Sequence, residues 1–132
     1  MMKDYKLPDS GERQEFNGGA VRDTAKGKPR PDLISPFFTE RLGRHLGLGA
    51  EKYSEWNWAK GIPNSRCYAS LMRHLTQFAQ GDESEDHLAA AACNIMFMIH
   101  NEEAEAKNAH LRVATGVLSD MPIFKKGNLN EK

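Results

Sequence analysis

The sequence predicts an all-α protein, a compact antiparallel helical bundle that follows an irregular N-terminal arm. Apolar residues recur at helical spacing between residues 35 and 106, two helix-start signals are present, and no alternating strand pattern stands out. A chain of 132 residues fits one domain with one modest core. We expect three parts: the arm (1–34), a helical domain (35–118) and a C-terminal tail (119–132).

The arm carries Pro and Gly at intervals and shows no sustained periodicity. A segment of this kind has no apolar stripe to hold it against a core, so we expect it to be ordered by what it binds. Its stretch "VRDTAKGKPR" (21–30) holds four cations and one acid. Ordinary surface charge is the simpler explanation of that bias when composition is considered alone.

The first predicted helix begins in "SPFFTERLGRHLG", where Ser35 is suited to be the N-cap and Pro36 the first helical residue. One face of this helix carries a mainly apolar stripe, which consists of Phe38, Leu42, His45 and Leu46. Three glycines weaken the helix, each by up to about 1 kcal/mol relative to Ala. We therefore expect a kink or break near Gly47–Gly49 and a restart at Ala50.

Two further helices follow a loop at "KGIPNSR". The second is expected from about Ser65 to Gln80, with Gly81 as its stop. The third is expected to open at "DESE", with Asp82 and Glu85 as a capping box, and to run to about Ala106. The very short turn between them requires antiparallel packing. A short fourth helix is possible around 108–118.

Composition excludes several classes of protein. Eighteen Lys and Arg balance eighteen Asp and Glu, which argues against a general nucleic-acid binder. The N-terminus has no apolar signal segment, and the longest apolar run is too short to span a bilayer. Cys67 and Cys93 form no CxxC pattern and are too few for a disulfide scaffold, so we expect a cytoplasmic protein without membrane partners.

Four acidic residues form the main candidate site. Glu51 and Glu55 are spaced by about one helical turn, and Glu83 and Asp86 form an ExxD pattern. If the two pairs faced each other, their repulsion would be tolerable only around a cation, and oxygen ligands favour Mg²⁺ or Mn²⁺. Each pair taken separately is better explained as solvated or helix-capping acids. The prediction depends on their recurrence on two helices.

Other polar and aromatic residues have open roles. Asn94 interrupts the apolar run "AAAACNIMFMI" and needs a hydrogen-bond partner, either a ligand or a structural group such as a backbone carbonyl or His74. Arg73 could reach a phosphate or pair with an acid. Trp56, Trp58 and Tyr53 are more often core residues than base-stacking ones. His87 could order Asp86 as a partner outside the ligand shell.

Three stretches together resemble a known family. The stretches "GGAVRDTAKGKPRPDLI", "GAEKYSEWNWAKGIPNSR" and "LMRHLTQFAQGDESEDHLAAAACNIMFMI" are similar to the phage and bacterial dATP/dGTP diphosphohydrolases. That family is a MazG-like (MazZ-type) branch of the all-α NTP pyrophosphatases. The resemblance covers about residues 17–103. It implies Mg²⁺- or Mn²⁺-dependent hydrolysis of a purine deoxynucleoside triphosphate (dATP or dGTP) to monophosphate and pyrophosphate, by a homodimer or homotetramer.

The resemblance also implies roles for individual residues. "EKYSE" stands where MazG-like proteins carry their first acids, making Glu51 the first metal and catalytic candidate and Glu55 the second. "ESED" stands at the ExxD pair and implies Glu83, or alternatively Glu85, with Asp86. The resemblance also implies that the arm binds the phosphates of the substrate. Residues of the helical domain are candidates for contacts with the base, the sugar or the phosphates. These substrate candidates are Arg22, Lys26, Lys28, Arg30, Asn57, Trp58, Arg73, His74 and Asn94.

Two other functions remain open at this point. One is a different metal-dependent phosphohydrolase or nuclease on a helical scaffold, and the other is a non-enzymatic helical module that binds nucleotides or proteins. Release of pyrophosphate distinguishes the expected reaction from that of a different phosphohydrolase or nuclease. A non-enzymatic module would show no metal-dependent turnover.

Overall fold

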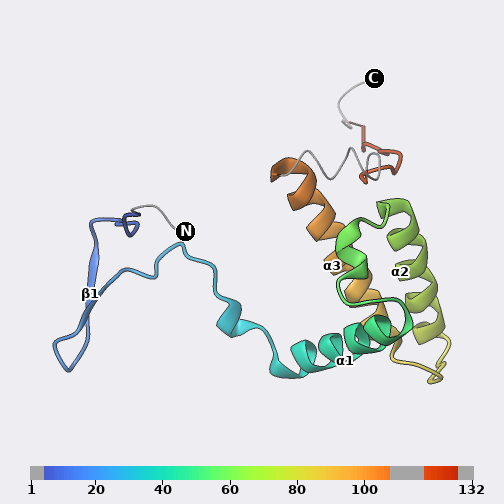
Figure 1. Cartoon of the computed structure of the whole chain (residues 1–132), viewed down its shortest axis with the longest axis horizontal. Coiled ribbons are helices and arrows are strands. Elements are labelled where there is room, and N and C mark those ends of the chain that lie inside the picture. The colour runs from blue at the N-terminus through green and yellow to red at the C-terminus, as the bar shows by residue number, and fades with distance from the viewer. Residues whose placement is uncertain (1–4, 108–117, 128–132) are drawn as a thin grey trace. The chain divides into compact units, whose positions relative to one another are not determined.

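A computed structural model describes residues 5–107 and 118–127 of the chain (Figure 1). It divides into two compact units, Met1–Ile34 and Ser35–Lys132. The second unit contains all the α-helices of the described residues, so the all-α class predicted from the sequence is confirmed.

The first unit contains a short hairpin that the sequence did not predict. Strand β1 (Arg13–Glu15) pairs antiparallel with β2 (Val21–Asp23), with Arg13 opposite Asp23. The turn between them closes through Gly19, which has a φ of +88° and donates its N–H to Phe16 O at 2.8 Å. Each strand is three residues long and mostly exposed, so no apolar alternation reveals it. A 3₁₀ turn, η1 (Pro31–Leu33), ends the unit.

Helix α1 (Pro36–Lys52) is continuous, so the predicted break near Gly47–Gly49 is wrong. Ser35 is its N-cap, as expected, and its hydroxyl oxygen accepts from Phe38 N. The helix lies across the N-terminal half of α3 (Figure 1). Tertiary packing of this kind outweighs the weak propensity of isolated glycines. The helix ends at Lys52, and Tyr53 caps its C-terminus.

Helices α2 (Asn64–Ala79) and α3 (His87–Lys107) form the predicted antiparallel pair (Figure 1). Gly81, with a φ of +76°, follows the end of α2. The start of α3 differs from the prediction: the helix begins at His87, and Asp86 occupies the capping position. The Asp86 carboxylate accepts from Ala89 N at 3.0 Å. Asp82 instead accepts from Ser84 N at 2.9 Å, within the loop.

The core lies where α2 and α3 meet, and small residues dominate it. Cys67, Cys93 and four alanines of α3 are buried there. Asn101 is also buried, and its amide donates to Ile62 O at 2.7 Å and to Asn64 Oδ1 at 2.9 Å. Small side chains allow the helix backbones to approach closely, so the domain needs few large apolar residues in this layer.

The end of the predicted helical domain and the start of the predicted tail are attached to the bundle. Leu118 is buried, and its carbonyl accepts from Asn64 N at 2.8 Å. Asp120 accepts from the backbone N–H of Ser65 at 2.8 Å and so caps the first turn of α2. The possible fourth helix falls mainly on residues 108–117, which lie outside the described residues. No helix of the described part has both the length and the apolar character to cross a membrane.

Candidate functional site

The structure does not place the predicted acidic pairs on two helical faces. Glu51 lies in the last turn of α1, whereas Glu55 lies beyond the end of that helix in an exposed turn. Glu83 lies in the loop between α2 and α3, and Asp86 caps α3. The shared helical faces expected from the spacing are therefore absent, because each segment leaves the helical conformation earlier or enters it later than the sequence indicated.

Asp86 is held by an arginine that the sequence analysis did not select. Arg41 Nε lies 2.8 Å from Asp86 Oδ2, and Arg41 Nη2 lies 2.6 Å from Oδ1. This two-point ion pair, with the hydrogen bond from Ala89 N, lowers the pKa of Asp86 to about 2. Both carboxylate oxygens of Asp86 are thus engaged within the chain.

The four predicted carboxylates do not converge in the described residues. A close group of three or more potential metal-ligating side chains occurs there at one place, and it consists of His74, Glu85 and His87. Of these, His74 was predicted as a substrate residue and Glu85 as the alternative to Glu83. Metal binding by the four predicted carboxylates stays a prediction. The described residues of one chain do not bring Glu51, Glu55, Glu83 and Asp86 together as one ligand set.

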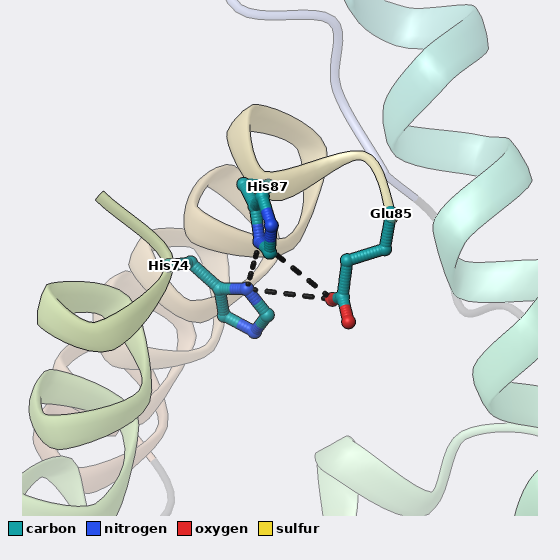
Figure 2. Close-up of side chains that lie close together, drawn as sticks. All are labelled: His74, Glu85 and His87. Carbon is teal, nitrogen blue, oxygen red and sulfur yellow. Dashed lines mark hydrogen bonds and ion pairs between the residues drawn. The ribbon is translucent and has the colours of Figure 1, made fainter. Parts of the chain in front are cut away.

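Figure 2 shows His74, Glu85 and His87 pointing toward one another from α2, the connecting loop and the first turn of α3. His74 Nδ1 lies 3.0 Å from His87 Nδ1 and 3.4 Å from Glu85 Oε1. The separation of His87 Nδ1 and Glu85 Oε1 is 4.0 Å. Burial, opposed in part by the charge of Glu85, lowers the pKa of His74, which favours a neutral imidazole at neutral pH.

A cavity of about 480 Å³ lies beside the C-terminal end of α1, and four aromatic side chains contribute to its lining. Its lining includes Tyr53, Glu55, Trp56, Asn57, Trp58 and Phe97. Trp58 belongs to η2 (Asn57–Lys60) and stacks on Phe97 of α3, with ring centroids 5.5 Å apart and planes at 16°. Predicted substrate residues Asn57 and Trp58 therefore line a single cavity, which Glu55 shares.

Trp56 at the edge of this cavity has an unusual backbone. Its φ is +61°, a left-handed conformation that is rare for a bulky residue. Its side chain is 69% exposed, although its ring lies 5.7 Å from that of Trp58. Bulky residues in this backbone conformation occur mainly at functional sites, so Trp56 is a candidate residue of the site.

The other predicted helical residues lie apart from this cavity. Asn94 on α3 donates to Ser70 Oγ at 3.2 Å and to Ala90 O at 2.9 Å. Of the structural partners named from the sequence, the backbone carbonyl is therefore present, and Ser70 is a second partner. Arg73 is exposed on α2. A substrate role for either residue stays a prediction.

The predicted arm cations differ in their pairing. Arg30 Nη2 lies 2.8 Å from Asp32, and Lys28 Nζ lies 3.9 Å from Asp23. Arg22 and Lys26 form no ion pair within the described part of the chain, and both are exposed. Lys26 lies in the turn that leads to Gly27, whose φ is +79°.

Sequence reasoning missed Arg41 as a residue of the candidate site. It gave His87 only the role of ordering Asp86, and it favoured a core position for Trp56. His74 and His87 lie 13 positions apart in the sequence, on either side of the loop that connects α2 to α3. That spacing, in an antiparallel pair joined by a short loop, places both side chains near the same end of the bundle. This spacing is the sequence feature from which the His74–His87 contact could have been predicted. The pairing of Arg41 with Asp86 has no such feature in the local sequence.

Comparison with known proteins gives the family. Residues 18–111 match the family model described as dATP/dGTP diphosphohydrolase, N-terminal. A relative named dATP/dGTP diphosphohydrolase, from Salmonella phage PMBT28, is 33% identical over 78 residues, which are 55% of this chain. The chain spans only 27% of that relative's length. No solved structure matches. Because the family model covers well over half of the sequence, the chain belongs to the dATP/dGTP diphosphohydrolase N-terminal family.

Proposed function

We propose that the protein hydrolyses purine deoxynucleoside triphosphates, dATP or dGTP, to the monophosphate and pyrophosphate. The observation that carries the proposal is the aromatic cavity found in a chain of this family. Tyr53, Trp56 and Trp58 offer flat apolar surfaces suited to a purine ring. The name of the phage relative, dATP/dGTP diphosphohydrolase, supports this substrate class.

In the proposed reaction, water attacks the α-phosphorus and the bond to the α–β bridging oxygen breaks, so that pyrophosphate leaves. Glu55 is assigned as the group that takes the proton, in preference to Glu51, because Glu55 lines the cavity. Asn57 is assigned to the edge of the base or the sugar. Arg22 and Lys26, which form no ion pair among the described residues, are assigned to the phosphates, together with Lys28 and Arg30.

A divalent cation, Mg²⁺ or Mn²⁺, is part of the proposal, because such ions usually accompany triphosphate substrates. The predicted carboxylates do not converge in the described chain, and Asp86 is already paired with Arg41. They do not fit a closed ligand set within one chain, so no chemical step is routed through a bound ion.

A homodimer or homotetramer is also proposed. Large apolar residues are exposed on α1 and α3: Phe37 at 80%, Phe38 at 50%, Ile95 at 46% and Ile99 at 57%. Large apolar residues with this exposure on a small domain are often covered at an interface between subunits, which supports the proposal. Light scattering coupled to size-exclusion chromatography measures the particle mass directly.

The test incubates the protein with each of the eight common ribo- and deoxyribonucleoside triphosphates, with Mg²⁺ or Mn²⁺, and identifies the products. The proposal expects deoxynucleoside monophosphate and pyrophosphate, with dATP or dGTP turned over fastest, and no turnover in EDTA. Release of orthophosphate would assign a different phosphohydrolase. Saturable binding of dATP or dGTP without turnover would assign a nucleotide-binding module instead.

A further inference from the structure

His74, Glu85 and His87 bring three ligand atoms to one point at the loop end of the α2–α3 pair (Figure 2). Their closest atoms all lie within 4.8 Å of one another, and they come from three different local segments. His87 is 1% exposed in its side chain, and His74 is 19% exposed. This arrangement is held by the fold, unlike a cluster of mobile surface acids.

The hydrogen bond on the far side of His87 bears on which of its two ring nitrogens carries the proton. His87 Nε2 lies 3.0 Å from Asp82 Oδ2. When Nε2–H donates to this carboxylate, Nδ1 of the neutral ring carries a lone pair. That lone pair is directed at His74 Nδ1 and toward Glu85. A carboxylate that fixes a histidine in this way is a recurrent feature of metal sites in proteins.

The spacing of the three atoms matches a metal site. The separations are 3.0 Å, 3.4 Å and 4.0 Å. A point in the plane of this triangle lies about 2 Å from all three atoms, which is the usual length of Zn–N and Zn–O bonds. The three separations therefore let one ion reach all three atoms. On binding, the ion takes the place of the proton that the two Nδ1 atoms share.

The donor set decides the class of ion. Two imidazoles and one carboxylate suit Zn²⁺ and its first-row neighbours, whereas Mg²⁺ prefers oxygen ligands alone. Glu85 is 50% exposed and also lines a cavity of about 200 Å³ with Asp82 and Arg41, which gives an ion access from solvent.

We propose that His74, Glu85 and His87 form a binding site for a divalent transition-metal ion of the Zn²⁺ class, with Asp82 as the partner that orients His87. The site is separate from the Mg²⁺- or Mn²⁺-dependent activity proposed above and does not rest on it. Its occupation ties α2 to the start of α3 through the connecting loop.

The test titrates the metal-free full chain with Zn²⁺ and with Co²⁺ by isothermal titration calorimetry, with excess Mg²⁺ present. We expect one saturable site per chain that Mg²⁺ does not displace. The Co²⁺ form should show visible absorption bands of the intensity typical of a four- or five-coordinate ion. The melting temperature should rise with Zn²⁺ concentration, because the ion binds the folded chain.

The variants Glu85→Gln and His74→Ala test the ligands. Asp82→Asn should weaken Zn²⁺ binding by roughly 10–100-fold, the usual effect of losing an outer partner, and His74→Ala should weaken it more. His87 is left unchanged because it is buried. Glu83→Gln is the matched control for Glu85→Gln: it removes the same charge from the same loop and should leave Zn²⁺ affinity unchanged. His45→Ala is the corresponding histidine control.

Circular dichroism confirms that each variant is folded before it is titrated. Failure of the wild-type chain to bind Zn²⁺ or Co²⁺ saturably would overturn the proposal. Binding that survives both His74→Ala and Glu85→Gln, or that is lost in Glu83→Gln instead, would overturn it equally. Loss of nucleotide hydrolysis in any of these variants does not bear on the result, since the readout is the ion itself.

Discussion

Arg41 on α1 and Asp86 at the start of α3 form a two-point ion pair, with Nε–Oδ2 at 2.8 Å and Nη2–Oδ1 at 2.6 Å. The same carboxylate caps α3 through Ala89 N. One side chain thus joins two helices and also begins one of them. Because α3 starts where Asp86 lies, this contact also sets the position of the neighbouring Glu85 and His87.

Substitution of Asp86 should destabilise the fold through two separable effects. Asp86→Asn keeps a side-chain oxygen for the cap and loses the charge, whereas Asp86→Ala loses both. Asp86→Ala should therefore lower the free energy of unfolding by about 1 kcal/mol more than Asp86→Asn, which is the usual cost of a lost N-cap. Urea denaturation of both variants measures the difference.

The control for the ion pair is a double-mutant cycle with Arg41→Ala. Once Arg41 is absent, Asp86→Asn should destabilise the chain less than it does in the wild type, because the pair is already lost. Equal effects in both backgrounds would show that the two side chains do not interact in solution.

Trp56→Gly should separate binding from stability at the aromatic cavity. Glycine adopts a φ of +61° without strain, so the melting temperature should stay the same or rise. Loss of an exposed ring that stacks on a purine should raise the KM for dATP or dGTP roughly fivefold or more. Trp56→Phe keeps a ring and should retain most of the affinity. An unchanged KM in Trp56→Gly would remove the residue from the site.

The helices could be predicted where the signals are local. The extent of α2 follows from its apolar spacing and from the stop at Gly81, and these lie within the segment itself. The start of α3 could not be predicted, since both Asp82 and Asp86 are acceptable caps. The choice depends on His87, which is buried and bonded to Asp82, and on Arg41 from another helix.

Part of the candidate site could be predicted because some of its residues are neighbours in the sequence. Asn57, Trp58 and Glu55 are close in sequence, and they line one cavity. The acids at 51, 55, 83 and 86 were expected to meet because of helical faces that do not form. The strands of the arm were not predicted. Each has only three residues, and these are mostly exposed, so neither strand shows an alternation of apolar and polar residues.

The arm cations should contribute unequally to turnover. Arg22 and Lys26 form no ion pair in the described residues, so their charge is available to phosphates, whereas Arg30 is engaged by Asp32. Arg22→Ala and Lys26→Ala should raise KM or lower kcat more than Arg30→Ala, with little change in melting temperature. Lys6→Ala serves as the control within the arm. A smaller particle with unchanged kinetics would assign these residues to a subunit interface.

The two cysteines should report on the contact between α1 and α3. Cys67 and Cys93 are each 1% exposed, and burial raises the pKa of both thiols, that of Cys93 to about 11. The thiolate is the reactive form, so a raised pKa and a buried sulfur should both slow labelling of the native protein at pH 8. In urea, both residues should react rapidly. Quantitative labelling of the folded chain within the time of the denatured control would contradict this burial.

Arg41→Ala should change this labelling selectively. Cys93 Sγ lies 3.9 Å from Leu42 O of α1, whereas Cys67 Sγ lies 3.7 Å from Ile62 O, outside α1. Removal of the Arg41–Asp86 pair loosens α1 from α3 and should expose Cys93 more often than Cys67. Mass spectrometry of peptides after timed labelling at pH 8 distinguishes the two sites, and Cys67→Ser isolates the signal of Cys93. Equal acceleration at both thiols would indicate opening of the whole domain, and the ion pair would then have no specific role in holding α1.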